Sequence, residues 1–117
     1  MLSMKDRRIA ELIIKHCLNI EEDVSTISES TFSTDRKTQN SICFDILQIG
    51  ELAKSLSGGF IAQYSAMPWK DIKGMGDWVA HGYQTIKMSR VWRTVAEEIK
   101  PLREYCESIL RDNPLNE

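Results

Sequence analysis

The chain has 117 residues, a hydrophobic fraction of 42% and a formal net charge of −2. Its length predicts one domain over residues 1–117, and its hydrophobic content is that of a folded chain rather than a disordered one. The weak negative charge argues against a protein that binds nucleic acid over its whole surface, but it leaves room for a local basic cleft.

Targeting signals and metal motifs are absent from the sequence pattern. No apolar run approaches the roughly 20 residues of a membrane span, and the N-terminus lacks the apolar core of a signal peptide, so we expect a cytoplasmic protein. The three cysteines, Cys17, Cys43 and Cys106, are scattered along the chain. Their spacing does not suit a zinc site, and we expect buried thiols in a reducing compartment with no metal or cofactor.

The first half of the chain predicts two long helices. Apolar residues recur at three- and four-residue steps and predict a first helix from about Lys5 to Ile27. The polar stretch 28–35 interrupts this pattern, and Ser33 or Thr34 is the expected N-cap of the next helix. A second apolar face predicts a helix over about 35–56, which the pair Gly58-Gly59 would end.

The second half is also helical in pattern. Residues 60–66 predict a short helix or turn, and Pro68 suits the first turn of a third helix that starts near Trp69 and ends around 80–82. An apolar stripe then predicts a last long helix over about 89–111, which Pro101 would kink rather than end. No segment shows the alternation of a strand. The sequence therefore predicts an all-α fold, an antiparallel helical bundle of four to five helices.

The residues with the most chemical content lie near the end of the third predicted helix. His81, one of two histidines, is followed by Gly82 and Tyr83. Two blocks around it resemble HEPN domains of the HepT toxin type. They are DILQIGELAKSLSGGF (residues 45–60) and MPWKDIKGMGDWVAHGYQTIKMSRVW (residues 67–92). In that family the second block carries an arginine, a polar residue, a short spacer and then His-x-Tyr.

The resemblance implies a function and a set of partners. HEPN domains of this type are metal-independent ribonucleases that act as homodimers, with the two motifs meeting in one cleft, so the implied substrate is RNA. HepT-type members are toxins paired with a small nucleotidyltransferase antitoxin. That partner neutralises the toxin by adenylylating the motif tyrosine, which corresponds to Tyr83 in this chain.

Metal-free RNA cleavage needs three functions, and this chain has candidates for two of them. A base must take the proton of the 2′-hydroxyl, and an acid must protonate the leaving 5′-oxygen. Histidine does either near neutral pH, so His81 is the candidate, and a dimer would bring two copies together. A cation must stabilise the charge on phosphorus, which arginine does as a permanently charged fork. Gly76 stands where the family pattern has that arginine, and Asp77 follows where the pattern has a polar residue.

The missing arginine predicts weakened or absent activity, because losing such a charge costs about 100- to 1000-fold in rate. We expect Asp77 to repel phosphate and Lys73 to compensate only in part. Gly76 has two explanations: a naturally degenerate domain kept for binding, or a variant that has lost its arginine. Glycine inside a helix costs about 0.5–1 kcal/mol relative to alanine, so the sequence gives it no packing purpose and favours the second explanation.

Plainer interpretations exist for the same side chains. His81 could be a polar residue at a helix end, and Tyr83 a half-packed surface residue. Trp78 could stack on a base, whereas Trp69 and Trp92 are expected to pack in the core.

Charged residues around the motif are equally open to two interpretations. A group of them either forms a phosphate-binding rim or is simply solvated: Lys70, Lys73, Lys87, Arg90 and Arg93. Asp45 and Glu51 could orient His81, although solvated carboxylates are more common. His16 is expected at the edge of the core and receives no function.

Two functional hypotheses result. The first is an RNA-cleaving toxin of the HepT type, weakened or inactive as written. The alternative is a non-catalytic HEPN interaction module that binds a nucleotidyltransferase partner through the same surface. Restoring arginine at position 76 separates them, because only the first hypothesis predicts cleavage that depends on His81.

Overall fold

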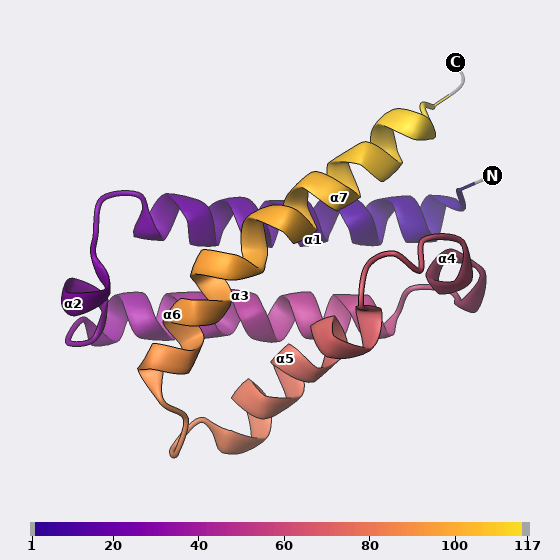
Figure 1. Cartoon of the computed structure of the whole chain (residues 1–117). Helices are drawn as coiled ribbons and strands as arrows, with labels where there is room; N and C mark the ends of the chain where they lie inside the picture. Colours follow the sequence, from indigo (N-terminus) through magenta and orange to yellow (C-terminus); the bar gives the residue numbers. More distant parts are fainter. Residues whose placement is uncertain (1, 116–117) are drawn as a thin grey trace.

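The computed structural model describes residues 2–115, which form helices joined by short turns and contain no strand (Figure 1). The helices are α1 (Met4–Val24), α2 (Glu29–Phe32), α3 (Arg36–Lys54), α4 (Gly58–Gln63), α5 (Trp69–Gly82), α6 (Met88–Glu97) and α7 (Ile99–Asp112). The predicted all-α bundle is confirmed. α1 and α3 run antiparallel side by side, α7 packs on α1, and α5 packs on α3.

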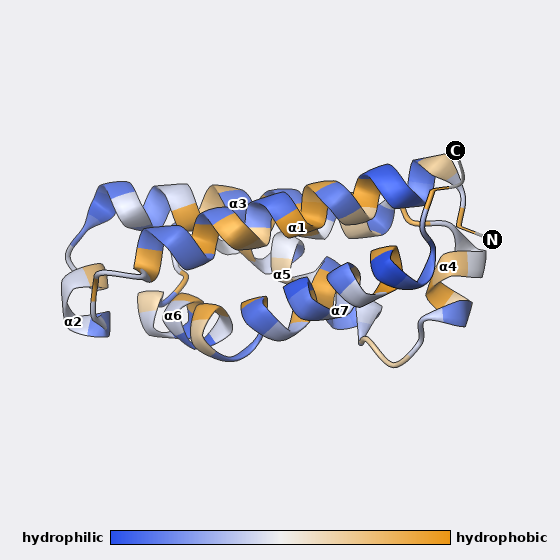
Figure 2. Cartoon of the chain, turned by 90° about the horizontal axis from the view of Figure 1, so that it is seen from above, coloured by the Kyte–Doolittle hydropathy of each residue, from blue (hydrophilic) through white to orange (hydrophobic). Residues whose placement is uncertain are grey.

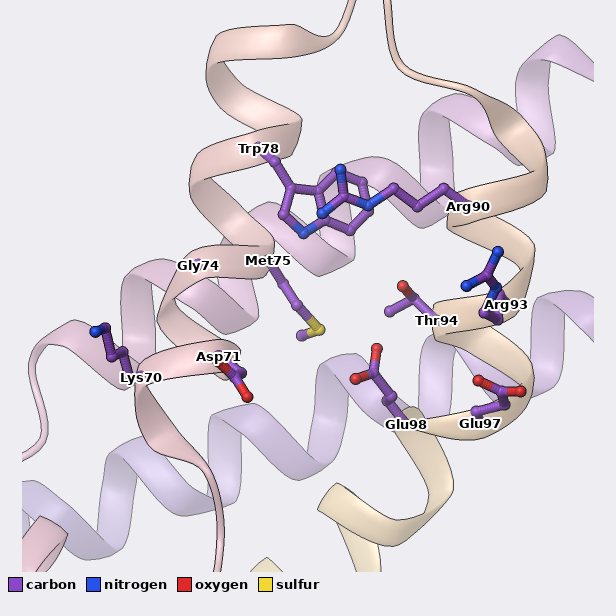
Figure 3. A pocket seen from close by; sticks show the side chains of 10 residues that line it. All are labelled: Lys70, Asp71, Gly74, Met75, Trp78, Arg90, Arg93, Thr94, Glu97 and Glu98. Atoms are coloured by element: carbon purple, nitrogen blue, oxygen red, sulfur yellow. The ribbon is translucent and has the colours of Figure 1, made fainter.

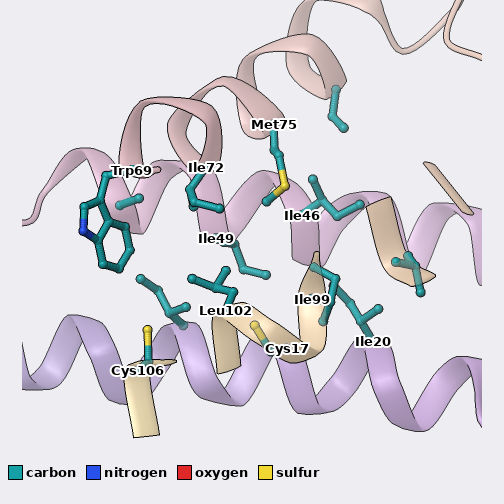
Figure 4. Packing of buried hydrophobic residues seen from close by; sticks show 14 of the residues in the cluster. Cys17, Ile20, Ile46, Ile49, Trp69, Ile72, Met75, Ile99, Leu102 and Cys106 are labelled. Carbon is teal, nitrogen blue, oxygen red and sulfur yellow. The ribbon is translucent and has the colours of Figure 1, made fainter. Parts of the chain in front are cut away.

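The core lies between these four helices, and hydrophobic residues mark one side of each (Figures 2 and 4). Fully buried side chains from α1, α3 and α7 meet at its centre. They include Ile13, Cys17, Ile20, Ile42, Ile46, Ile49, Ile99, Leu102, Cys106 and Ile109. The three cysteines are free and buried, as expected, and burial raises the pKa of Cys43 to about 11 and that of Cys106 to about 12.

The connection between α1 and α3 differs from the prediction. A short helix, α2, forms within the polar stretch, because Ser28 accepts a hydrogen bond from the Thr31 N–H and Phe32 is buried. The predicted N-caps were wrong. Ser33 ends α2 with an N–H bond to the Glu29 carbonyl, and Asp35 caps α3 by accepting from the Thr38 N–H at 3.2 Å.

The ends of the first two long helices are also earlier than predicted. α1 ends at Val24, and Ile27 lies in a turn where it still packs partly against the core. α3 ends at Lys54 rather than near residue 56. The pair Gly58-Gly59 does not end α3: Ser57 caps α4, and both glycines lie in its first turn with negative φ.

The last predicted helix is divided in two at Glu98. Glu98, three residues before Pro101, has φ −117° and ψ −25°, so α6 ends at Glu97 and α7 begins at Ile99. Proline has no N–H for the carbonyl four residues earlier and crowds it, which opens the helix on the N-terminal side of the ring. The break lets α7 follow α1 while α6 turns toward α2, where Trp92 packs on Phe32 at a ring distance of 5.3 Å.

One buried carboxylate ties the N-terminus to α4. Asp6 accepts hydrogen bonds from the Ser57 N–H at 2.9 Å and the Ser57 hydroxyl at 2.6 Å. Burial alone would raise the pKa of Asp6, but these hydrogen bonds hold the pKa below its ordinary value. Across the helices of residues 2–115, none combines the length and the apolar character that crossing a membrane would require.

Candidate active site at the turn between α5 and α6

The motif lies on the last turn of α5, and this helix begins and ends as predicted. Trp69 starts it as a buried residue whose Nε1–H donates to the Tyr64 carbonyl at 3.0 Å. α5 then packs along α3 and ends at Gly82, where a short turn leads into α6. The C-terminal end of α5 is thereby exposed beside the start of α6, and His81 is on that exposed end.

His81 faces an open pocket of about 540 Å³. The turn and both helices contribute to the lining, which consists of Trp78, His81, Gly82, Thr85, Ile86, Lys87 and Arg90. Two of these side chains are cations, and no carboxylate is among them. Such a lining favours a phosphate group next to the imidazole.

Arg90 is held in this pocket by Trp78. The guanidinium carbon of Arg90 lies 4.3 Å from the centre of the Trp78 ring, and Figure 3 shows the guanidinium lying across the indole. Trp78 itself is half-buried against the core. Because Arg90 covers a face of the ring, that face is not open for the base stacking that the sequence suggested for Trp78.

A second pocket of about 600 Å³ continues from Trp78 and Arg90 along the groove between α5 and α6 (Figure 3). Its charges are mixed, because Lys70 and Arg93 share it with Asp71, Glu97 and Glu98. The suggested basic rim is therefore split between two sites. Lys87 and Arg90 line the His81 pocket, whereas Lys73 lines neither pocket.

Gly76 has a packing role that the sequence did not reveal. It is buried where α5 crosses α3, opposite Gly50. A Cβ at Gly76 would lie 3.0 Å from the Gly50 Cα and 3.3 Å from the Leu47 carbonyl oxygen, so the helices would have to separate slightly. The argument that glycine is purposeless here was wrong, and it no longer favours a lost arginine over a natural glycine.

Asp77 forms an ion pair across the helices with a lysine that it shares with a second carboxylate. The Lys54 ammonium on α3 donates to the Asp77 carboxylate at 2.6 Å and to Glu51 at 3.1 Å. The hydrogen bond from Lys54 holds the pKa of Asp77 below its ordinary value, and the same bond raises the pKa of Lys54. The sequence did not reveal this ion pair, which offsets part of the repulsion expected between Asp77 and a phosphate.

The other carboxylates considered for His81 have different partners. Asp45 is buried and bonds to His16 Nδ1 at 2.8 Å, which joins α3 to α1. The Glu51 carboxylate accepts a hydrogen bond from the Lys54 ammonium. His16 is accordingly the core-edge histidine that the sequence indicated.

Tyr83 faces away from the His81 pocket. Its hydroxyl donates to the Asn40 side-chain oxygen on α3. The ring borders a mostly apolar pocket of about 440 Å³, whose lining is Asn40, Cys43, Phe44, Leu47, Val79, Ala80 and Tyr83. Phe44, at 57% exposed, is the most open large hydrophobic side chain of this lining. The side chains of His81 and Tyr83 therefore line two different pockets on neighbouring surfaces.

Two partners of the motif, Lys54 and Asn40, gave no signal in the sequence, and a third, Arg90, was only one of five cations considered for a phosphate-binding rim. Arg90 follows His81 by nine residues, a spacing that has no meaning until the turn after α5 folds the chain back. Lys54 and Asn40 lie on α3, far from the motif along the chain. Within residues 2–115, no cluster of His, Cys, Asp and Glu is arranged to hold a metal ion.

Comparison with known proteins adds the family. The "Ribonuclease HepT-like" model matches residues 13–109. "Putative RNase TTE0752" of Caldanaerobacter subterraneus subsp. tengcongensis is 31% identical over 105 residues, 90% of this chain and 94% of that protein. "Probable ribonuclease HepT" of Thermococcus cleftensis is 30% identical over 90 residues, 77% of this chain and 82% of that protein. No solved structure matches the chain at a significant level. Since the family model spans the fold from α1 to α7, the chain belongs to the HepT-like ribonuclease family.

Proposed function

We propose that this protein is a metal-independent endoribonuclease of the HepT toxin type, in which His81 transfers the protons and Gly76 weakens the activity. The observation that carries the proposal is the position of His81, exposed in a pocket that has two cations and no carboxylate in its lining. Membership of the family supplies the class of reaction. The names of the relatives, which are called ribonucleases, support RNA as the substrate.

The proposed reaction is transesterification within the RNA. A neutral His81 takes the proton of the 2′-hydroxyl, and the 2′-oxygen forms a bond to the adjacent phosphorus. The bond from phosphorus to the 5′-oxygen breaks, and a protonated His81 delivers its proton to that leaving oxygen. The products are a 2′,3′-cyclic phosphate and a 5′-hydroxyl. One histidine gains the proton that the other gives, so the protons balance.

This scheme needs two histidines, and a homodimer would supply them. The exposed Phe44 and the apolar pocket beside Tyr83 lie on the α3–α5 surface next to the motif. A second copy of the chain docked on this surface would bury Phe44 and bring its own His81 close. The homodimer and its use of this surface are part of the proposal.

The proposed regulation acts through Tyr83. A small nucleotidyltransferase antitoxin would transfer AMP from ATP to the Tyr83 hydroxyl, releasing pyrophosphate. Tyr83 is half-buried at the rim of its pocket, with Asn40 at its hydroxyl. Mass spectrometry of the chain after incubation with such an enzyme and ATP tests this, with Tyr83→Phe as the control. AMP on a residue other than Tyr83, or no AMP on the parent chain, would contradict the proposed modification.

The first experiment is RNA cleavage in the presence of a chelator, by this chain, Gly76→Arg, and each combined with His81→Ala. We expect weak cleavage by the chain, stronger cleavage by Gly76→Arg, and none by the His81→Ala forms. The cyclic phosphate end is the diagnostic product.

Gly76→Ala is the matched control, because it adds the Cβ at the helix crossing without the charge. A melting temperature for each variant separates a loss of folding from a loss of chemistry. RNA cleavage that persists in the His81→Ala variants would contradict the proposed function.

The second candidate is a non-catalytic interaction module, and the fit of Gly76 against Gly50 favours it. Because glycine lets α5 pack closely on α3 at this position, it is compatible with a domain that naturally lacks the motif arginine. This candidate predicts no cleavage by either form, together with binding of a nucleotidyltransferase that is unchanged by His81→Ala.

A further inference from the structure

We infer that Arg90 supplies the phosphate-binding charge of the His81 pocket, in the role that an arginine at position 76 would otherwise fill, and that Trp78 positions it. This inference rests on the proposed function, since it concerns the same pocket. Its starting point is that Arg90 and His81 belong to different helices and line one cavity of about 540 Å³.

Arg90 stands out among the cations near the motif because it both lines the His81 pocket and is stacked on Trp78. Among residues 2–115, no carboxylate lies within ion-pair distance of its guanidinium, whereas Lys54 is held by Glu51 and Asp77. Arg90 lies between the two pockets and lines both, whereas Arg93, one turn further on, lines only the mixed-charge groove. The Arg90 guanidinium, with no ion pair among the described residues, is thus available to a ligand in the His81 pocket.

The stacking on Trp78 orders this charge. A guanidinium that lies over an aromatic face keeps its N–H donors in its own plane, directed away from the ring. These donors match the oxygens of a phosphate, and holding them in place reduces the entropy that binding would cost. Lys87 also lines the pocket, but its ammonium is an exposed, flexible point charge.

The positions of the three side chains suit one phosphodiester. Trp78 and His81 are three residues apart on α5, a spacing that puts their Cβ atoms about 5–6 Å apart on one side of the helix. Arg90 lies over Trp78 at 4.3 Å. A phosphate bound by Arg90 at the rim of the indole would therefore be a neighbour of the His81 imidazole.

The test compares Arg90→Ala and Arg90→Lys with the parent chain, and uses Arg111→Ala as the matched control. Arg111 is an exposed arginine in the last turn of α7, and it lines neither pocket. In metal-free RNA cleavage we expect Arg90→Ala to lose about 100- to 1000-fold and Arg90→Lys to recover part of the rate. Arg111→Ala should cleave like the parent.

A binding experiment keeps this inference separate from the proposed function. Affinity for a short RNA is measured at several salt concentrations for His81→Ala and for the same chain with Arg90→Ala or Arg111→Ala added. Arg90→Ala should weaken binding and lower the slope of log affinity against log salt by about one.

Each outcome then has one meaning. If neither the parent nor Gly76→Arg cuts RNA, the proposed function fails, and the binding experiment alone decides the role of Arg90. If Arg90→Ala cuts and binds RNA like Arg111→Ala, the inference is overturned whatever the parent does.

Trp78 is tested as a positioning residue. Trp78→Phe keeps an aromatic core contact but offers a smaller face to the guanidinium. We expect it to reduce RNA affinity in the chain that has Arg90 and to have no further effect when Arg90 is already alanine. An equal effect in both backgrounds would mean that Trp78 acts independently of Arg90 and would overturn its positioning role.

Discussion

Gly50 on α3 and Gly76 on α5 meet through their backbones where the two helices cross. A Cβ added to Gly50 would lie 2.7 Å from the Gly76 Cα and 2.8 Å from the Gly76 nitrogen, closer than side-chain carbons are found in proteins. The middle of α5, five residues before His81, is thus seated directly on α3. The position of the motif therefore depends on a residue that has no chemistry of its own.

The first prediction concerns this crossing. Gly50→Ala should destabilise the protein by about 1–3 kcal/mol, because the added methyl group forces α5 away from α3. Gly74→Ala is the matched control within α5. Its Cβ meets nothing within 4 Å, so it should stabilise the helix by about 0.5–1 kcal/mol. Urea denaturation measures both, and equal effects of the two changes would contradict the packing argument.

The second prediction concerns the ion pair between Lys54 and Asp77. Lys54→Ala removes the cation that compensates Asp77, and the exposed carboxylate then lies one turn before His81. Affinity for RNA should fall by about two- to fivefold and should return when Asp77→Ala is added. Lys100→Ala, an exposed lysine on α7, controls for the loss of net charge. An affinity that stays low in the double variant would show that Lys54 itself binds the RNA.

The third prediction concerns the proposed homodimer. Phe44 is 57% exposed on α3 beside the Tyr83 pocket, so Phe44→Asp should leave the fold intact. We expect it to convert a dimer to a monomer in light scattering and to abolish metal-free cleavage, since each pocket has one histidine. Met4→Asp, which changes an exposed residue at the start of α1, is the control. A parent chain that is monomeric at working concentration would refute the dimer.

The fourth prediction concerns pH. The folded-state pKa of Asp6 is below its ordinary value of 3.8, so its contribution to stability is present above that value and is lost as pH falls through the folded-state pKa. Asp6→Asn should destabilise the protein by about 1–3 kcal/mol at neutral pH. The difference between the two proteins should shrink under acid conditions below pH 3.8. Thermal unfolding across this range measures it, and a difference independent of pH would exclude the carboxylate as its cause.

Local patterns in the sequence were enough to predict the bundle and the helix that carries the motif. Pro68 and Trp69 predicted the start of α5, and the spacing of the apolar residues after them predicted its extent to about Gly82. The turn signals were less decisive, because Gly58 adopts helical geometry once Ser57 caps α4. Pro101 was correctly identified as a disturbance, but the helix opens before the ring rather than at it.

The site itself was only half predictable. His81 and Tyr83 were visible because they are neighbours along the chain. Their separation onto two surfaces, the contact of Asp77 with Lys54, and the stacking of Arg90 on Trp78 each depend on residues from another helix. Such contacts leave no periodic trace in the sequence, and neither does the fit between Gly50 and Gly76.

The packing of α7 on α1 joins two helices that lie far apart along the sequence. Ile99, Leu102 and Cys106 from α7 complete a core that α1 and α3 leave open. Contacts between such distant residues form late, because a long loop must close before they contribute. The core therefore stays incomplete until α7 has packed on α1, and α5 remains on an incomplete support until then. A protein with the activity proposed here would therefore become active only once α7, the last helix to form, has joined the core.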